Sequence, residues 1–379
     1  MRKLSFLFFA PLIFSCGRPT SEVSLSRNVL EDFSFTVDTV VVNPGEEILN
    51  LAWGIRLGGF SLDQKKLYLL NDVDQSVSVI DLDELKLENK IQFEKEGPNG
   101  IGQHINGVQV LNGDRFLFKG FQKNAIFNSQ GEKEVVIELL AANIDSLSED
   151  DENAAWYGLQ MTRDEKRLFS LPGDFFEGVR DFLVADFPSQ KGRILKTPAM
   201  DFLADYRIVL KSEEMMSVYA EDMSLQEFDG KIVLRNSASS GIYLYDLSTD
   251  SLQYKTYQHS LVPSKKEGKI QNEVSSQDGF KTEMAKLTEQ IGFETFFWDG
   301  NSERYYRFGR IFLPKPDPEA EQKANIFLFA YDRDFNLIGE TKLEELTKVP
   351  TTPFFKDGKL WSYVNVGDEL GFAVMDLNF

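Results

Sequence analysis

The sequence predicts an all-β fold, a six-bladed β-propeller with one short inserted helix. The first observation behind this prediction is a pair of short apolar strands that recurs along the chain. The repeats start about 50 to 70 residues apart, which is typical of propeller blades with loop insertions. The runs are rich in β-branched and aromatic residues and are bounded by turn residues, as strands are. The six pairs are 67–70 with 77–81, 115–118 with 124–127, 167–170 with 182–186, 231–234 with 242–246, 305–308 with 326–329, and 359–362 with 372–376.

The second observation concerns the two ends of the chain. The sixth repeat stops at Phe379, directly after its third strand, so a four-stranded blade would lack its outer strand there. Residues 33–42, FSFTVDTVVV, form an additional strand before the first repeat. We expect this N-terminal strand to pair with residues 371–377 and to close the ring, because closure removes exposed strand edges.

The third observation is a change of hydrophobic period between the fourth and fifth repeats. Phe280, Met284, Leu287 and Ile291 recur at helical spacing with charged residues between them. This pattern predicts a short amphipathic helix over residues 276–292. The helix would lie on one rim of the ring or, alternatively, form a lid over its central channel.

The N-terminus has the pattern of a bacterial lipoprotein signal peptide. A basic start at Arg2 and Lys3 is followed by an apolar run that is too short to span a bilayer, which needs about 20 residues. The run ends at Cys16, the only cysteine, which we expect to be acylated; an ordinary signal peptide cleaved elsewhere is the alternative. We therefore divide the chain into a signal peptide (1–16), a polar tether (17–31) and a propeller domain (32–379).

Composition restricts the partners of the protein. The net charge of −19 argues against nucleic acid and anionic membrane surfaces, because both are polyanions. Hydrophobic residues make up 42% of the chain, which is enough for a packed core. The single cysteine excludes disulfide bonds within the chain and is compatible with an oxidising periplasm.

The chain resembles a known family of bacterial lipoproteins. The lipobox cysteine Cys16, the segment 94–100 (EKEGPNG) after the first repeat, and Trp298-Asp299 followed by residues 304–308 (RYYRF) carry the resemblance. They are similar to the domain-of-unknown-function 4221 family of Bacteroidota. The resemblance implies a propeller-like fold and an envelope location, and it implies no catalytic residues. Gly17 and the lack of an acidic run after Cys16 favour the periplasmic side of the outer membrane.

No catalytic or metal-binding motif is recognisable. The sequence has no G-x-S-x-G nucleophile elbow, and its two histidines, His104 and His259, are too few for a three-histidine zinc site. Residues 332–336 (DRDFN) begin like a calcium loop, but Leu337 replaces the required glycine, so a hairpin turn is expected. We predict neither a metal nor another cofactor.

Polar and aromatic residues near strand ends are the remaining candidates for ligand binding. An arginine in an apolar strand is costly unless it is paired or lies at a rim. The alternative role of such residues is an inter-blade salt bridge or a hydrogen bond to a carbonyl. The candidates are His104, Asn236, Trp298, Asp299, Arg304, Tyr306 and Arg307.

Two functions are compatible with these features. The first is a lipid-anchored ligand- or protein-binding module that meets an envelope protein or a glycan on its loop face. The second is a carboxylate-based propeller hydrolase or lyase acting on an envelope or nutrient glycan, with help from Arg307 and His104. The sequence leaves open whether the protein is an enzyme, although the lack of catalytic motifs favours the binding module.

Overall fold

The fold is all-β, as predicted. The computed structural model describes residues 28–120, 123–148, 154–155, 157–174, 178–211, 216–317 and 319–379. The predicted signal peptide and most of the predicted tether therefore lie outside the described residues. Each of the twelve predicted runs lies within an observed strand.

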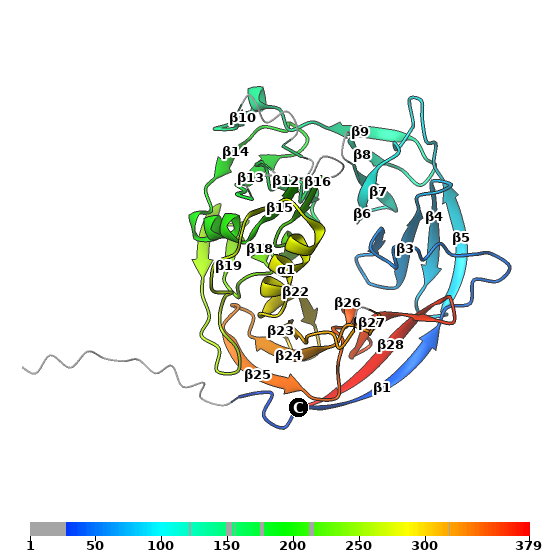
Figure 1. Ribbon diagram of the computed structural model, residues 1–379. Helices are drawn as coiled ribbons and strands as arrows, with labels where there is room; N and C mark the ends of the chain where they lie inside the picture. The colour runs from blue at the N-terminus through cyan, green and yellow to red at the C-terminus, as the bar shows by residue number, and fades with distance from the viewer. Residues whose placement is uncertain are drawn as a thin grey trace, which may run out of the picture.

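Within the described residues, most strands form consecutive antiparallel sheets, which we number 1 to 6 in chain order. Figure 1 shows these sheets following one another around the molecule. Sheet 1 consists of β2 (Gly58–Phe60), β3 (Lys66–Asn71), β4 (Ser76–Asp81) and β5 (Lys86–Gln92), and sheet 2 of β6 (Ile105–Leu111), β7 (Arg115–Gly120), β8 (Asn124–Phe127) and β9 (Lys133–Ile137). Sheet 3 consists of β11 (Gln160–Met161), β12 (Arg167–Ser170), β13 (Phe182–Asp186) and β14 (Gly192–Leu195), with β10 (Ile144–Asp145) added in parallel to β14.

The second half of the chain repeats this arrangement. Sheet 4 consists of β17 (Met223–Phe228), β18 (Lys231–Asn236), β19 (Ile242–Asp246) and β20 (Ser251–Lys255), and sheet 5 of β22 (Gly292–Asp299), β23 (Arg304–Phe312), β24 (Ala324–Tyr331) and β25 (Leu337–Leu343). Sheet 6 consists of β26 (Thr351–Lys356), β27 (Lys359–Val366), β28 (Glu369–Asn378) and β1 (Ser34–Val41).

The hydrophobic core lies between neighbouring sheets. Tyr68 of sheet 1 packs edge-on against Phe116 of sheet 2, with ring centroids 5.3 Å apart. Comparable clusters join sheets 2 and 3, 3 and 4, 4 and 5, and 5 and 6. A further cluster places Phe354 and Trp361 of sheet 6 against Leu67 and Leu69 of sheet 1. Because the middle strands are covered on both faces, they are apolar throughout rather than alternating.

The predicted pairing of the N-terminal strand is confirmed. β1 runs antiparallel to β28 over eight residues, from Ser34 opposite Asn378 to Val41 opposite Gly371. The two ends of the described chain therefore lie in one sheet, and β1 forms its outer edge (Figure 1).

The residues just before β1 are also packed, which the sequence did not indicate. The Asn28 side chain donates to the Glu340 carbonyl (2.9 Å) and accepts from the Glu340 amide (3.0 Å). Leu30 is 1% exposed within the cluster between sheets 5 and 6. Residues 28–31 were assigned to the polar tether, but in the structure they belong to the folded domain.

The predicted helix is confirmed and forms part of an insertion between sheets 4 and 5. Helix α1 (Gln277–Thr288) begins after Ser276, whose hydroxyl accepts from the Gly279 amide. Leu287 is fully buried in the hydrophobic cluster that includes residues of sheets 3 and 4, and α1 packs against residues 208–211. An unpredicted small sheet, made of β15 (Ile208–Lys211), β16 (Met216–Tyr219) and β21 (Glu273–Val274), and the 3-10 helix η2 (Pro198–Tyr206) complete the fold.

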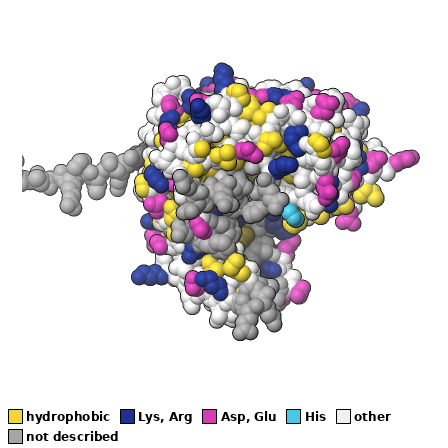
Figure 2. Space-filling model, turned by 90° about the horizontal axis from the view of Figure 1, so that it is seen from above, with side chains coloured by type: hydrophobic (Ala, Val, Ile, Leu, Met, Phe, Trp, Pro, Cys, Tyr) yellow, Lys and Arg dark blue, Asp and Glu magenta, His cyan; other side chains and the backbone are white. Residues whose placement is uncertain are grey.

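The surface is mixed in character. Figure 2 shows acidic and basic side chains interspersed over one side of the molecule, with hydrophobic side chains only in small groups. In the described part of the chain, no helix is long and apolar enough to cross a membrane.

Candidate functional site

Two cavities lie at opposite ends of the first strands of the sheets. The cavity that we call the hairpin cavity is lined by turns that follow first strands, such as the β2–β3, β22–β23 and β26–β27 turns. The cavity that we call the mouth cavity is lined by residues at or before the starts of β2, β6, β11 and β17. Segments from several sheets therefore converge at each end.

The hairpin cavity contains two of the predicted site residues, Trp298 and Asp299, and measures about 620 Å³. Asp299 is 5% exposed, and its carboxylate accepts from the Asn301 amide (2.9 Å) and the Ser302 hydroxyl (2.6 Å). Trp298 packs against Tyr305, with ring centroids 4.5 Å apart. Both residues thus build the β22–β23 turn.

Other carboxylates of the hairpin cavity are also used in turns. Asp63 accepts from the Ser61 hydroxyl (2.6 Å) and the Lys65 amide (3.1 Å), and these bonds, the hydroxyl bond first, lower its pKa. Asp357 accepts from the Lys356 ammonium at 2.5 Å. These carboxylates already have partners, whereas the side chains of Arg163 and Asp229, which also line the hairpin cavity, make no hydrogen bond or ion pair with a described residue.

Arg307 and Asn236 have structural roles, so Arg307 cannot act in the cavity chemistry predicted for it. Arg307 is fully buried and donates to the carbonyls of Glu294 (2.7 Å), Ser240 (2.9 Å) and Asn236 (2.8 Å). Burial lowers its pKa to about 10. The Asn236 side chain is fully buried and bonds the amide and hydroxyl of Ser239. These contacts match the alternative role, a hydrogen bond to carbonyls between sheets 4 and 5.

Arg304 and Tyr306 lie beside the packed C-terminus. The fully buried Tyr306 ring stacks near Phe355 and Phe379, at 5.8 and 5.9 Å between centroids. The Arg304 guanidinium lies 5.7 Å from the Phe379 ring. Neither residue lines the hairpin or the mouth cavity.

The predicted hairpin turn at residues 332–336 is confirmed. One Asp332 carboxylate oxygen accepts from the amides of Asp334 (2.9 Å) and Asn336 (2.8 Å). The described residues contain no group of three or more histidine, cysteine, aspartate and glutamate side chains that could hold a metal ion.

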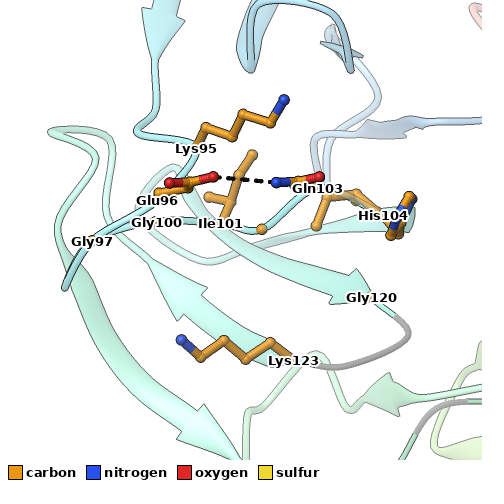
Figure 3. A pocket seen from close by; sticks show the side chains of 11 residues that line it. Lys95, Glu96, Gly97, Gly100, Ile101, Gln103, His104, Gly120 and Lys123 are labelled. Carbon is orange, nitrogen blue, oxygen red and sulfur yellow. Dashed lines mark hydrogen bonds between the residues drawn. The ribbon is translucent and has the colours of Figure 1, made fainter.

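His104 belongs to the other end of the molecule. It is exposed and lines the mouth cavity, which measures about 600 Å³. It also lines a neighbouring cavity of about 680 Å³ between sheets 1 and 2. Figure 3 shows that neighbouring cavity, with Lys95 and Lys123 on either side of the hydrogen bond from Gln103 to Glu96 (3.2 Å). The two cavities adjoin through Gln103, His104 and Ile105.

Lys119 is the most unusual residue of the mouth cavity. It is the last residue but one of β7 and lies opposite Gly107, which has no side chain to block it. A Cβ atom at position 107 would lie 3.3 Å from Lys119 Cε. Burial lowers the pKa of the Lys119 ammonium to about 8. Among the described residues, the ammonium has no hydrogen-bond or ion-pair partner.

Two further side chains of the mouth cavity have no side-chain partner. Arg56 and His104 make no side-chain hydrogen bond or ion pair with any described residue. Trp53 is 57% exposed at the same cavity, although a large apolar ring normally avoids water. Among the described residues, the mouth cavity therefore presents unpaired cationic side chains and an exposed indole ring to a ligand.

Sequence reasoning identified His104 but missed Lys119, Arg56 and Trp53. The available signal was Lys119, a lysine inside the apolar run RFLFKG, to which the argument about arginines in strands applies equally. Arg56 and Trp53 lie in a turn-rich segment without a periodic pattern, so nothing in the sequence indicated their position.

The fold and the cavities define the class of protein as an all-β protein of consecutive sheets with a ligand-sized cavity at each end of their first strands. A family model described as domain of unknown function (DUF4221) matches residues 27–342. The chain belongs to this family, as the sequence resemblance indicated. No curated protein matches the sequence.

The chain is similar to solved structures at low sequence identity. A DUF4221 family member from Bacteroides vulgatus is 14% identical, with a TM-score of 0.64 over 91% of this chain and 98% of that one. Hydrazine synthase from Kuenenia stuttgartiensis is 11% identical, with a TM-score of 0.44 over 86% of this chain and 78% of that one. The β-propeller domain of Cps50 (Swd1) from Myceliophteria thermophila is 9% identical, with a TM-score of 0.43 over 85% and 83%.

Proposed function

We propose that the protein is a six-bladed, closed β-propeller that serves as a lipid-anchored binding module of the bacterial envelope. Sheets 1 to 6 would be the blades, and β1 would close the ring as the outer strand of the sixth. Two contacts support closure: the β1–β28 ladder and the hydrophobic cluster between sheets 6 and 1. A ring of this kind leaves its centre free for a ligand.

The mouth cavity is the observation that carries the binding function. Ligand sites are concave and combine apolar surface with a few polar groups that converge from different elements. Here Trp53 supplies apolar surface, and Arg56, His104 and Lys119 supply polar groups that have no side-chain partner in the described part of the chain. In the hairpin cavity the Asp63 and Asp299 carboxylates are bonded within their own turns, and the Arg163 guanidinium, which has no partner among the described residues, is accompanied by the Asp229 carboxylate.

The anchor would be Cys16, acylated after signal cleavage, with the domain on the periplasmic side of the outer membrane. The support for this part is the sequence: the basic start, the short apolar run and the single cysteine at its end. A partner in the envelope, a protein or a glycan, would then meet the mouth cavity.

A hydrolase or lyase is the second candidate. The carboxylates of Asp72 and Asp222 and the imidazole of His104 line the same cavity, which is the convergence that such an enzyme requires. Asp222 is bonded to Arg235, however, and Asp72 accepts a hydrogen bond from the Asn50 side-chain amide at 3.3 Å.

Incubation with oligosaccharides separates the two candidates. Ligand recovered intact supports binding, and products whose formation requires both Asp72 and Asp222 support catalysis.

A binding screen tests the proposed function directly. The protein lacking residues 1–27 would be titrated with neutral, acidic and amino sugars and with short peptides, followed by nuclear magnetic resonance of the ligand. We expect one class to bind and Trp53→Ala to weaken its binding at least tenfold. Leu62→Ala is the matched control, since Leu62 is 47% exposed and lines the hairpin cavity. Equal binding by both variants would place the ligand elsewhere, and no binding by any class would refute the module.

A further inference from the structure

We infer that the mouth cavity recognises a carboxylate-bearing saccharide, with the carboxylate held by Arg56 and Lys119 and the sugar ring on Trp53. This inference rests on the proposed binding function and names the ligand class of the same site. It is carried by three features that the described residues give the cavity: a partly buried ammonium without a partner among them, an excess of free cations and an exposed indole.

Lys119 has the position expected of a ligand-binding residue, because its backbone is held in a strand and the residue lines the cavity. Its backbone is fixed in β7 by pairing with Gly107 on one side and Asn124 on the other. The aliphatic part of the Lys119 side chain lies close to Gly107, and Lys119 lines the mouth cavity. A cation that loses its hydration without a protein partner is costly, and an anionic ligand would remove that cost.

The charged groups around Lys119 leave the cavity with a positive excess. Arg56 precedes β2, Asp72 follows β3, His104 precedes β6, and Asp222 lies next to β17. The Asp222 carboxylate is already neutralised by the Arg235 guanidinium. Among the described residues that line the cavity, Asp72 thus remains against two free cations, Arg56 and Lys119, in a chain whose net charge is −19. An anionic ligand would pair with these two cations and would so account for their presence in an acidic protein.

A carboxylate on a sugar suits these groups better than a free inorganic anion. A planar carboxylate can accept two parallel hydrogen bonds from a guanidinium such as that of Arg56 and a third from an ammonium. The apolar face of a sugar ring can cover an indole, and Trp53 lies in the same turn as Arg56, whose amide donates to the Trp53 carbonyl (3.3 Å). Inorganic phosphate would use the cations and leave Trp53 uncovered.

The test compares three probes on the protein lacking residues 1–27: glucuronic acid, glucose and inorganic phosphate, each followed by ligand-observed nuclear magnetic resonance at pH 7. We expect glucuronic acid to bind at least tenfold more tightly than the other two. Lys119→Met and Arg56→Met should each weaken it at least tenfold. Lys211→Met, which removes an exposed lysine of the small sheet, should leave it unchanged.

Three other results would each contradict the inference, and they differ in what they leave intact. Equal, Trp53-dependent binding of glucose and glucuronic acid would refute the acidic ligand and leave the binding function intact. Binding of phosphate without glucuronic acid would refute the saccharide. Failure of these three probes, together with success of another class in the wider screen, would refute the inference alone.

The protonation state of Lys119 offers a second readout. Between pH 7 and pH 9 the carboxylate of glucuronic acid stays ionised, whereas the Lys119 ammonium, with a pKa of about 8, loses its proton. Affinity should therefore fall over this range in the native protein and should persist to pH 9 in Lys119→Arg, whose guanidinium stays charged. A parallel fall in both proteins would show that Lys119 does not hold the ligand.

Discussion

Arg307, which is fully buried, and Lys119, which is partly buried, are two cationic residues of apolar strands that differ in their partners. Arg307 is surrounded by three carbonyl acceptors, and its guanidinium also lies 5.0 and 4.9 Å from the rings of Phe293 and Phe296. Lys119 has no such partner among the described residues. We therefore assign Arg307 to stability and Lys119 to function, since proteins retain a destabilised group where it serves a site.

The structural role of Arg307 predicts a large loss of stability on its removal. Arg307→Ala leaves the carbonyls of Glu294, Ser240 and Asn236 without donors and creates a cavity between sheets 4 and 5. We expect the free energy of unfolding to fall by about 3–5 kcal/mol. Urea denaturation measures this, with Arg333→Ala as the control, because Arg333 forms an exposed pair with Glu303. Similar midpoints for the two variants would contradict the structural role.

The functional role of Lys119 predicts the opposite effect. Lys119→Met removes a desolvated charge, so we expect the free energy of unfolding at pH 7 to rise by about 1–3 kcal/mol. The pKa is about 8 in the folded protein and near 10.5 in the unfolded chain, so the folded state binds fewer protons between these values. Stability of the native protein should therefore rise with pH over this interval, and the advantage of the variant should shrink.

Urea denaturation at pH 7 and pH 10 measures both quantities in the native protein and in Lys119→Met. A variant that is less stable than the native protein at pH 7 would contradict the view that Lys119 is retained at a cost to stability.

At the scale of elements, the N-terminal segment is the part of the chain on which the architecture depends most. β1 supplies eight residues of backbone pairing to β28, and the residues before it add the Asn28 contacts and the buried Leu30. Without this segment, β28 would be an exposed edge strand of ten residues, which is a site of aggregation.

Two deletions test this dependence. Deleting residues 17–27 should leave the melting temperature nearly unchanged, because a polar tether buries little. Deleting residues 17–42 removes β1, Leu30 and Val42, and we expect the melting temperature to fall by about 10 °C or more, with aggregation. Thermal melts and light scattering measure both effects. Equal stability of the two proteins would show that β1 is dispensable.

At the scale of the whole molecule, the proposed ring and the proposed anchor determine how a ligand would reach the site. The mouth and hairpin cavities lie at opposite ends of the first strands, so a ligand of the mouth cavity would approach from one face of the ring while the hairpin turns lie on the other. The net charge of −19 would keep an anchored domain away from anionic lipid headgroups, which leaves the mouth cavity accessible.

The anchor is tested by one substitution. Cys16→Ser removes the acceptor for the acyl chains, each of which stabilises membrane binding by about 0.8 kcal/mol per buried CH₂. We expect the protein to move from the membrane fraction to the soluble fraction after cell lysis. Unchanged membrane association, measured by fractionation and immunoblotting, would rule out the lipoprotein assignment.

The sequence by itself determined the two middle strands of each of the six sheets and the order of the sheets. Short apolar runs bounded by turn residues are local signals, and they located the strands of the pairs 67–70 with 77–81 and 359–362 with 372–376 within β3, β4, β27 and β28. The sequence also predicted the pairing of β1 with β28, because the last repeat lacks an outer strand and the N-terminal strand belongs to no repeat of its own. The helical spacing of Phe280, Met284 and Leu287 likewise predicted α1.

Only the tertiary structure decided which polar residues face a cavity. Arg307 and Lys119 both interrupt apolar strands, and the sequence does not reveal that one faces carbonyls of the neighbouring sheet while the other faces an open space over Gly107. Trp53, Arg56 and His104 come together because segments before different first strands converge at one end of the molecule. The physical reason is that strand patterns depend on neighbours along the chain, whereas a site depends on contacts between residues far apart in it.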